Sequence, residues 1–299
     1  MMRNLMMVLA FDGADFHGWQ HQPGLRTVQG TLEQALRRCL RHQVAVIGCS
    51  RTDSGVHAGA YVANCFSTSP VKTESIFRSI GSRLPKDMTL LHLAEVPLTF
   101  HATRSAITKL YRYRIHNVTA RPCEHLTQRY VYHFWQPLDM DRMQTAARAW
   151  VGAHDFTSFA SAGNDRQSNV RTIRRIEFYR VDQEIRMDIE GEGFLYKQVR
   201  NMMGTLVEIG RGRWPVESAT EILAAKDRSK AGPTAPARGL CLQWVRYDLR
   251  GLPPPSEEML QRAQSAEPPK GGPREWVDHH PRSTAPMPPG VETSEEPSA

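Results

Sequence analysis

The sequence predicts an α+β fold in which helices lie on one face of a largely antiparallel sheet. Three observations support this prediction. Short apolar or alternating runs are typical of strands, and longer runs with apolar residues at every third or fourth position are typical of helices. The runs follow one another as strand, helix, strand, strand, helix, strand, and a similar order occurs a second time. This order indicates two split βαβ, or ferredoxin-like, halves.

The first half of the chain contains every element of one such unit. Asn4 to Phe11 is predicted to form a strand, and Thr27 is a candidate N-cap for the helix that follows it. The apolar positions of that helix, from Val28 to Leu40, share one face, whereas Arg37, Arg38 and Arg41 lie off it. The remaining predicted elements are a strand, a tight loop and a strand within residues 44–66, a helix over 74–84 and a strand over 88–96.

The second half begins with a strictly alternating segment, Lys109 to Ile115. Its alternation places Tyr111 and Tyr113 on one face of a strand and two arginines on the other. The elements predicted after it are a helix from Asp139 or Asp141 to Val151, a hairpin of residues 176–181 and 185–190, helices over 196–209 and 216–225, and a closing strand over 240–247. We therefore expect two domains, residues 1–107 and 108–250, related by an ancient duplication.

The last 49 residues, 251–299, differ in composition from the rest of the chain. They contain eleven of the twenty prolines, show no periodicity and are predicted to be disordered. They also carry four Lys and Arg against eight Asp and Glu, a net charge of −4, so the formal total of +7 leaves +11 for residues 1–250. A basic body of this kind suits a polyanionic partner, and RNA is the commonest one.

Several classes of protein are disfavoured by composition. No apolar run approaches the length of a membrane helix, and the apolar stretch near the N-terminus is too short for a signal peptide, so we expect a cytoplasmic protein. The five cysteines are scattered and include no Cys-x-x-Cys pair, which favours reduced thiols and gives no zinc-site pattern.

The segment Cys49 to Gly59 is the strongest candidate for a functional site. It places a cation, Arg51, a carboxylate, Asp53, and a glycine, Gly55, within five residues between two predicted strands. A loop at the end of a sheet is where rigid scaffolds usually place chemistry. Asp-Ser-Gly alone is also an ordinary turn sequence, so the interpretation depends on the rest of the chain.

Several distant blocks together resemble the bacterial tRNA pseudouridine synthase A family over about residues 4–248. Any one block would be weak, but all of them occur in order. They are Phe11-Asp12-Gly13 through Gly18-Trp19-Gln20, Gln22-Pro23, Thr27-Val28-Gln29, Arg51 through Ala58, Phe100-His101-Ala102, Tyr111-Arg112-Tyr113, Gly152 through Phe156, Gly193-Phe194-Leu195, Val199-Arg200-Asn201, Gly204 through Glu208 and Ala231 through Ala237.

The resemblance implies the conversion of uridine to pseudouridine in the anticodon arm of tRNA, at positions 38–40, without a cofactor or metal. Asp53 matches the family's catalytic aspartate and Arg200 the arginine that pairs with it. Arg51 matches a residue that helps to hold RNA and the loop, and Tyr111 matches the tyrosine that packs on the flipped base. The resemblance also implies a homodimer and a basic cleft between the two halves that takes tRNA. We expect His57 to pack behind the loop as a structural residue.

The sequence departs from the family pattern at several positions. Thr103 stands where the family usually has arginine, and Ala60-Tyr61 stand in place of Gly-Gln. These departures bear on which uridines are accepted. Two other readings stay open: a related synthase with a different RNA target, and an RNA-binding or RNA-folding module whose catalysis has lapsed.

Overall fold

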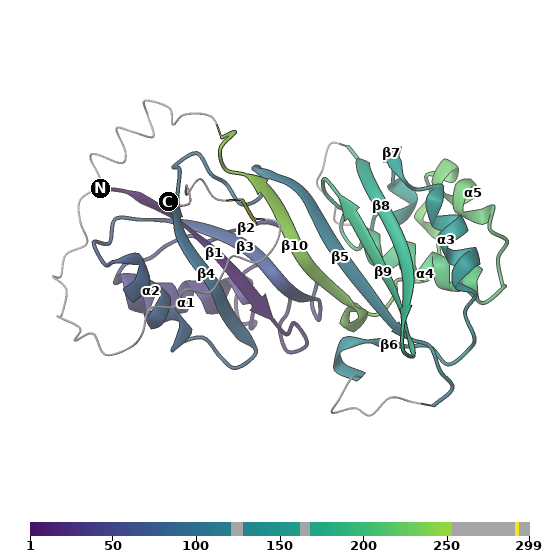
Figure 1. Ribbon diagram of the computed structural model, residues 1–299, viewed down its shortest axis with the longest axis horizontal. Helices are drawn as coiled ribbons and strands as arrows, with labels where there is room; N and C mark the ends of the chain where they lie inside the picture. Colours follow the sequence, from purple (N-terminus) through teal and green to yellow (C-terminus); the bar gives the residue numbers. More distant parts are fainter. Residues whose placement is uncertain (121–127, 162–167, 253–290, 293–299) are drawn as a thin grey trace, which may run out of the picture. The chain divides into compact units, whose positions relative to one another are not determined.

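The computed structural model describes residues 1–120, 128–161, 168–252 and 291–292, and it confirms the predicted fold class (Figure 1). The described strands pair in a mostly antiparallel manner, and helices pack against them. The chain divides into two compact units. Unit 1 comprises residues 1–52, 58–107 and the described residues from Trp244 onward, and unit 2 comprises Asp53–His57 and Thr108–Gln243. The loop of Asp53, which chain order placed in the first half, therefore groups with the second unit.

Unit 1 is built around a central strand, β1 (Arg3–Phe11), whose side chains from Leu5 to Leu9 are fully buried. It pairs antiparallel with β3 (His57–Ser67) on one side and with β4 (Met88–Val96) on the other. Helices α1 (Val28–Leu40) and α2 (Thr73–Gly81) pack together, and α2 packs on β4. The two-residue strand β2 (Ile47–Gly48) pairs with β3 and leads into the segment before Asp53.

Helix α1 forms where its sequence signals indicate. The Thr27 side chain accepts a hydrogen bond from Gly30 N, so it caps one of the amides that the helix leaves unpaired. Val28, Leu32 and Leu36 are completely buried, while Arg37 and Arg38 point to solvent. Burial of this face stabilises the helix far more than propensity does.

Unit 2 contains a second antiparallel series in the order β5-β9-β8-β7. Its elements are β5 (Ala106–His116, of which Thr108 onward belongs to the unit), β6 (Tyr132–His133), α3 (Met140–Arg148), β7 (Gly152–Asp155), β8 (Val170–Val181), β9 (Glu184–Gly191), α4 (Gln198–Gly210) and α5 (Ser218–Ala225). Helices α3, α4 and α5 pack on one another, and α3 covers β8 (Figure 1). Strand β10 (Leu240–Asp248) is divided, with Gln243 the last residue in unit 2.

The structure differs from the predicted elements in several respects, and β8, for example, begins at Val170, six residues before the predicted strand. The apolar run Val44–Ile47 contributes only its last residue to a strand, and the two short strands β6 and β7 were not predicted. Val291 and Glu292 form β11, which pairs in parallel with β10, so these two residues of the predicted disordered tail are in regular structure. The other tail residues past Leu252 lie outside the described ranges. No helix in those ranges has the length and hydropathy needed to cross a membrane.

Candidate active site

Asp53 lies in a tight turn whose geometry follows from its sequence. Val56 N donates to Asp53 O at 3.2 Å and closes the turn. Gly55 has a φ of 80°, in the left-handed region that favours glycine. Within unit 2, a Cβ added to Gly55 would lie 3.2 Å from the Ala237 methyl carbon, so the turn also sits close to that residue.

The carboxylate of Asp53 and the guanidinium of Arg200 form an ion pair, as the resemblance predicted. Arg200 Nη1 donates to Asp53 Oδ2 at 2.6 Å, and the two side chains are 13% and 12% exposed. Shelter from water strengthens such a charge-assisted bond. Among the described residues, Oδ1 of Asp53 receives no hydrogen bond, so Arg200 binds one carboxylate oxygen and leaves the other without a donor.

Arg200 is itself held by the segment Ala231–Ala237. Its Nε donates to Ala235 O at 2.8 Å, and Ala235 N donates to the Arg200 carbonyl at 3.1 Å. Both ends of the arginine are therefore fixed by one residue. With Nε bound to Ala235 O, the guanidinium directs its Nη1 at Asp53. The contact with Ala235 therefore fixes the direction of the ion pair.

The segment Ala231–Ala237 is in turn attached to α4 by polar residues inside that helix. The Thr205 hydroxyl accepts from Gly232 N at 2.9 Å, and Asn201 Oδ1 accepts from the Thr234 hydroxyl at 2.6 Å. Asn201 also donates to Phe159 O at 2.8 Å. No role was predicted from the sequence for Asn201 or Thr205. The feature that could have marked them in the sequence is that both are polar and lie on the buried face of an otherwise apolar helix.

The two tyrosines of β5 lie on one face, as the alternation predicted. Tyr111 is 5% exposed and contacts Phe194 edge to face at 5.3 Å between ring centroids. Tyr113 is completely buried and donates to Pro236 O at 2.6 Å. Burial raises the pKa of Tyr113 well above its usual value, so its phenol stays protonated and holds the Pro236 carbonyl.

Arg51 and His57 belong to the same motif as Asp53 but differ in burial and in contacts. Arg51 belongs to unit 1 and is exposed, so its guanidinium is available to a ligand from solvent. The His57 ring is buried and packs on the Tyr130 ring with centroids 5.1 Å apart, in line with the structural role expected for it.

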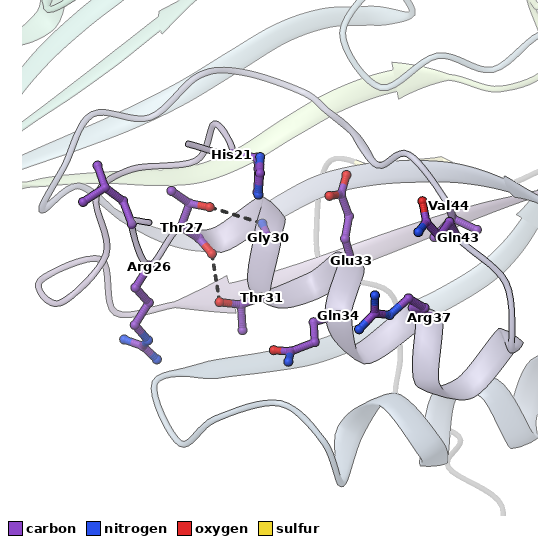
Figure 2. Close-up of a pocket in the computed structure, with 11 residues that line it drawn as sticks. His21, Arg26, Thr27, Gly30, Thr31, Glu33, Gln34, Arg37, Gln43 and Val44 are labelled. Atoms are coloured by element: carbon purple, nitrogen blue, oxygen red, sulfur yellow. Dashed lines mark hydrogen bonds between the residues drawn. The ribbon is translucent and has the colours of Figure 1, made fainter. Parts of the chain in front are cut away.

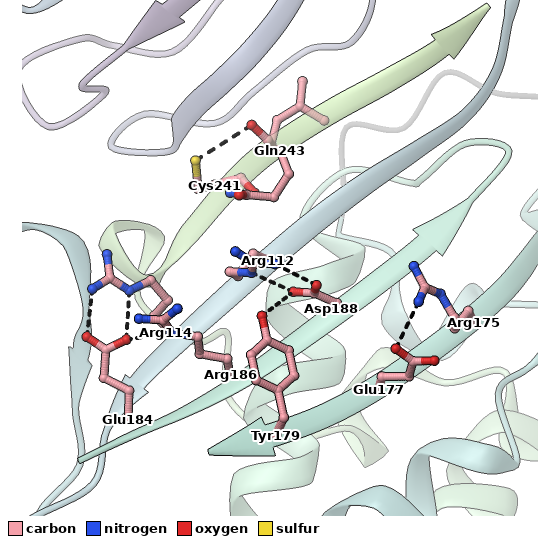
Figure 3. A network of polar contacts seen from close by, with 11 residues as sticks. Arg112, Arg114, Arg175, Glu177, Tyr179, Glu184, Arg186, Asp188, Cys241 and Gln243 are labelled. Atoms are coloured by element: carbon pink, nitrogen blue, oxygen red, sulfur yellow. Dashed lines mark hydrogen bonds and ion pairs between the residues drawn. The ribbon is translucent and has the colours of Figure 1, made fainter. Parts of the chain in front are cut away.

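The other face of β5 carries a separate polar network (Figure 3). Arg112 binds Asp188 through two nitrogens at 2.7 and 2.8 Å. Arg114 and Arg186 both bind Glu184, and although burial opposes it, these two arginines lower the pKa of Glu184. The charges of this face largely neutralise one another, so we assign it no part in the reaction.

A cationic groove runs along α1 in unit 1 (Figure 2). It consists of one hollow of about 510 Å³ and an adjoining one of about 330 Å³, which share Arg26, Thr31 and Gln34. Their lining also includes three further arginines from α1 and the segment after α2: Arg37, Arg38 and Arg83. The acid Glu33 is turned to the main chain, where it accepts from Val46 N at 3.0 Å. The groove therefore presents mainly positive charge.

Within the same described ranges, no group of three or more His, Cys, Asp or Glu side chains is arranged to hold a metal ion. The four cysteines described, Cys39, Cys49, Cys65 and Cys241, form no disulfide bond within those ranges.

The chain is similar in sequence to one family of known proteins. The family model described as tRNA pseudouridine synthase matches residues 7–104 and 146–248. A relative named tRNA pseudouridine synthase A from Clostridium kluyveri is 38% identical over 82% of this chain and 100% of its own length. Another of that name, from Halalkalibacterium halodurans, is 42% identical over 80% of this chain and 90% of its own length. A solved structure titled "Crystal Structure of a Cbf5-Nop10-Gar1 Complex" covers 79% of this chain and 57% of that one, with a TM-score of 0.34 at 9% identity.

Proposed function

The chain belongs to the tRNA pseudouridine synthase family, and on this premise we propose that it isomerises uridines 38–40 of the tRNA anticodon arm with Asp53 as the catalytic carboxylate. One observation carries the role of Asp53. Its side chain, in the strongest motif of the chain, pairs at 2.6 Å with an arginine more than a hundred residues away. Such a pair, sheltered and with one carboxylate oxygen open, suits a reacting group.

The reaction needs no net change of atoms. The bond between N1 of uracil and C1′ of ribose breaks, the base turns, and C5 bonds to C1′ in its place. The proton leaves C5, and N1 gains one. Asp53 serves either as the nucleophile that holds the freed sugar or as the base that takes a proton, and both roles require its ionised form. Arg200 supplies the opposite charge at hydrogen-bond distance from this carboxylate.

The other candidate residues, Tyr111 and Arg51, bind the substrate in this proposal. A base paired in a stem is inaccessible, so the target uridine is flipped out of the helix. Tyr111 has an aromatic ring with a polar tip, which suits the flipped base although only 5% of the residue is exposed beside Phe194. Exposed Arg51 offers a charge to a neighbouring phosphate. The basic excess of residues 1–250 supports contacts to the rest of the tRNA.

We further propose that the enzyme works in the cytoplasm as a homodimer, as the resemblance implies. Sedimentation equilibrium with and without tRNA tests the dimer, because a monomer at all concentrations up to those of the assay would exclude it.

The direct test of the function is release of tritium from tRNA transcripts labelled at C5 of uridine. We expect release with the wild-type protein and none with Asp53→Ala. Mapping the product positions then separates the anticodon-arm proposal from a related synthase with another RNA target. A catalytically lapsed module would release no tritium in either form, and the presence of both Asp53 and Arg200 argues against it.

A further inference from the structure

The main chain that leads into Asp53 has little regular structure to hold it. Strand β2 ends at Gly48, and Cys49 N makes one more bond to β3, to Val62 O at 2.9 Å. The four residues from Cys49 to Thr52 then run outside any strand. Their position must come from contacts other than sheet pairing.

Two side chains from distant parts of unit 1 bind carbonyls of this segment. The Tyr61 hydroxyl, from β3, donates to Ser50 O and also accepts from Ser50 N at 3.4 Å. The Thr103 hydroxyl, from the loop before β5, donates to Gly48 O at 2.6 Å. The two bonds hold the chain at both ends of Cys49.

The phenol of Tyr61 is itself rigidly held. Its ring is completely buried and stacks on Trp19 with centroids 4.3 Å apart and planes at 24°. The main-chain N of Trp19 donates to Thr52 O at 3.1 Å, so the residue that carries this indole also contacts the residue before Asp53. A Cβ at Gly48 would lie only 2.5 Å from the Trp19 ring, so the segment passes these rings at the closest distance that glycine allows.

We propose that Tyr61 and Thr103 are positioning residues for the reaction, which act through the main chain of residues 48–52 on Asp53 and Arg51. This inference rests on the proposed function. Rates in enzyme sites depend steeply on the placement of the reacting group, and a displacement of about 1 Å can cost about a hundredfold. The hydroxyls of Tyr61 and Thr103 limit such displacement on the N-terminal side of Asp53.

Both residues stand where this chain departs from the pattern of the family it resembles. Thr103 replaces the usual arginine, and Tyr61 replaces the usual glutamine of Gly-Gln. We call the hydrogen bonds from the Tyr61 and Thr103 hydroxyls to residues 48–50 the brace. It is inferred from the contacts of this chain alone.

The test removes each hydroxyl with little change of shape. Tyr61→Phe keeps the ring on Trp19, and Thr103→Val keeps the volume of the side chain. In each variant we expect the single-turnover rate on tRNA to fall about tenfold, the effect of one lost hydrogen bond to the main chain, while KM stays within about twofold. Thr103→Ser, which retains the hydroxyl, should restore most of the rate.

Thr99→Val is the matched control, because the Thr99 hydroxyl is buried and has no hydrogen-bond partner among the described residues. We expect it to leave the rate unchanged. A second readout that does not depend on activity is hydrogen exchange of the amides from Cys49 to Asp53. Their exchange should speed up in Tyr61→Phe and Thr103→Val but not in Thr99→Val.

The outcomes separate the brace from the function. If wild-type protein turns over tRNA and both hydroxyl variants match it in rate and exchange, the brace is overturned. The same holds if Thr99→Val loses as much rate as they do, or if KM rises in place of a fall in rate. A wild-type protein without turnover on tRNA contradicts the proposed function instead, and the exchange measurement then still decides whether the two hydroxyls hold the segment.

Discussion

At the scale of single residues, the direction of the Arg200 guanidinium explains why an arginine is needed. Nε is bound to Ala235 O and Nη1 to Asp53 Oδ2, so two bonds leave the same planar group in different directions. A lysine ammonium could meet either partner but not both in fixed geometry. The residue thereby links the carboxylate to the segment Ala231–Ala237.

We predict that Asp53→Ala and Asp53→Asn abolish turnover and change tRNA affinity by no more than a few-fold. Phosphate contacts carry most of the affinity for a nucleic acid, and Asp53 supplies none. Tritium release and filter binding on the same preparations measure the two quantities. Turnover by Asp53→Asn, with deamidation to aspartate excluded by mass spectrometry, would show that another group does the chemistry.

Removing the partner should be nearly as damaging. We expect Arg200→Met to lower turnover by ~10²-fold, since an unpaired sheltered carboxylate costs on the order of 3 kcal/mol. Arg200→Lys should recover only part of the loss, for the geometric reason above. Arg174→Met is the control, because Arg174 pairs with Glu192 where both side chains are nearly half exposed. Equal losses in the Arg200 and Arg174 variants would remove the special role of the pair.

At the scale of secondary-structure elements, α1 combines a buried apolar face with an exposed cationic one. Arg37 and Arg38 are both exposed and line the cationic groove, Arg37 in the hollow shown in Figure 2 and Arg38 in the adjoining one. Exposed arginines on a helix are often merely solvated. Their place in a groove that Arg26 and Arg83 also line favours contact with phosphate.

We therefore predict that Arg37→Ala and Arg38→Ala weaken tRNA binding without changing the single-turnover rate at saturation. Each lost phosphate contact should reduce the slope of log affinity against log salt by about 1. Arg180→Ala, which removes the same charge from an exposed position on β8, controls for net charge. A salt slope that changes equally in all three variants would mean that only total charge matters.

An ion pair holds the entry to α1 against the turn before β4. Arg26 binds Asp87 through two nitrogens at 2.7 and 2.8 Å, and this hydrogen bonding lowers the pKa of Asp87 below its ordinary 3.8 and raises that of Arg26. A carboxyl with a lowered native pKa stabilises the fold above its unfolded pKa. That stability is lost as pH falls through the native value.

We predict that Asp87→Asn lowers the free energy of unfolding at pH 7 by less than about 1 kcal/mol, because Arg26 is 40% exposed and screened by water. The difference from wild type should shrink as pH falls below 4 and the wild-type carboxyl is protonated. Urea unfolding of wild type and Asp87→Asn between pH 7 and pH 3 measures this difference in the free energy of unfolding. A difference as large at pH 3 as at pH 7 would assign the effect to packing and not to charge.

Periodicity predicted the long elements but not the short ones. The apolar spacing from Val28 to Leu40 and the alternation around Tyr111 and Tyr113 gave the correct element and the correct face, because burial of one face imposes the period. Strands β2 and β6 have two residues each, too few for any period. They form because longer strands offer them an edge, which is a property of the assembled sheet.

The candidate site was predictable in the same uneven way. Motif resemblance indicated the pair of Asp53 and Arg200, which the structure brings together. It did not indicate how Ala235, Asn201 and Thr205 hold that arginine, since their contacts span residues up to 35 apart and leave no local pattern. The brace from Tyr61 and Thr103 was equally hidden, because the sequence marked these positions only as departures.

At the scale of the whole molecule, charge should govern how tRNA is recognised. Residues 1–250 carry a net +11, and the deep groove of an RNA stem hides base edges from side chains.

We predict that affinity for tRNA falls steeply with salt and that changed base pairs beside the target matter little while helical geometry is kept. An isolated anticodon stem-loop should bind more weakly than whole tRNA. Affinity and turnover of both RNAs across a salt series test this, and a flat salt dependence would point to a reader of local sequence.

The hydrogen bonds between Ala231–Ala237 and α4 also determine how the folded protein meets a protease. By composition the segment Ala-Gly-Pro-Thr-Ala-Pro-Ala resembles the exposed loops where proteases usually nick a domain. Here, however, Ala235 is 3% exposed, and main-chain groups of Gly232 and Ala235 are bonded to the helix. A protease needs an extended, released substrate, so cleavage here requires local unfolding first. The segment should survive limited digestion intact, and a nick within it would report that the support of Arg200 has opened.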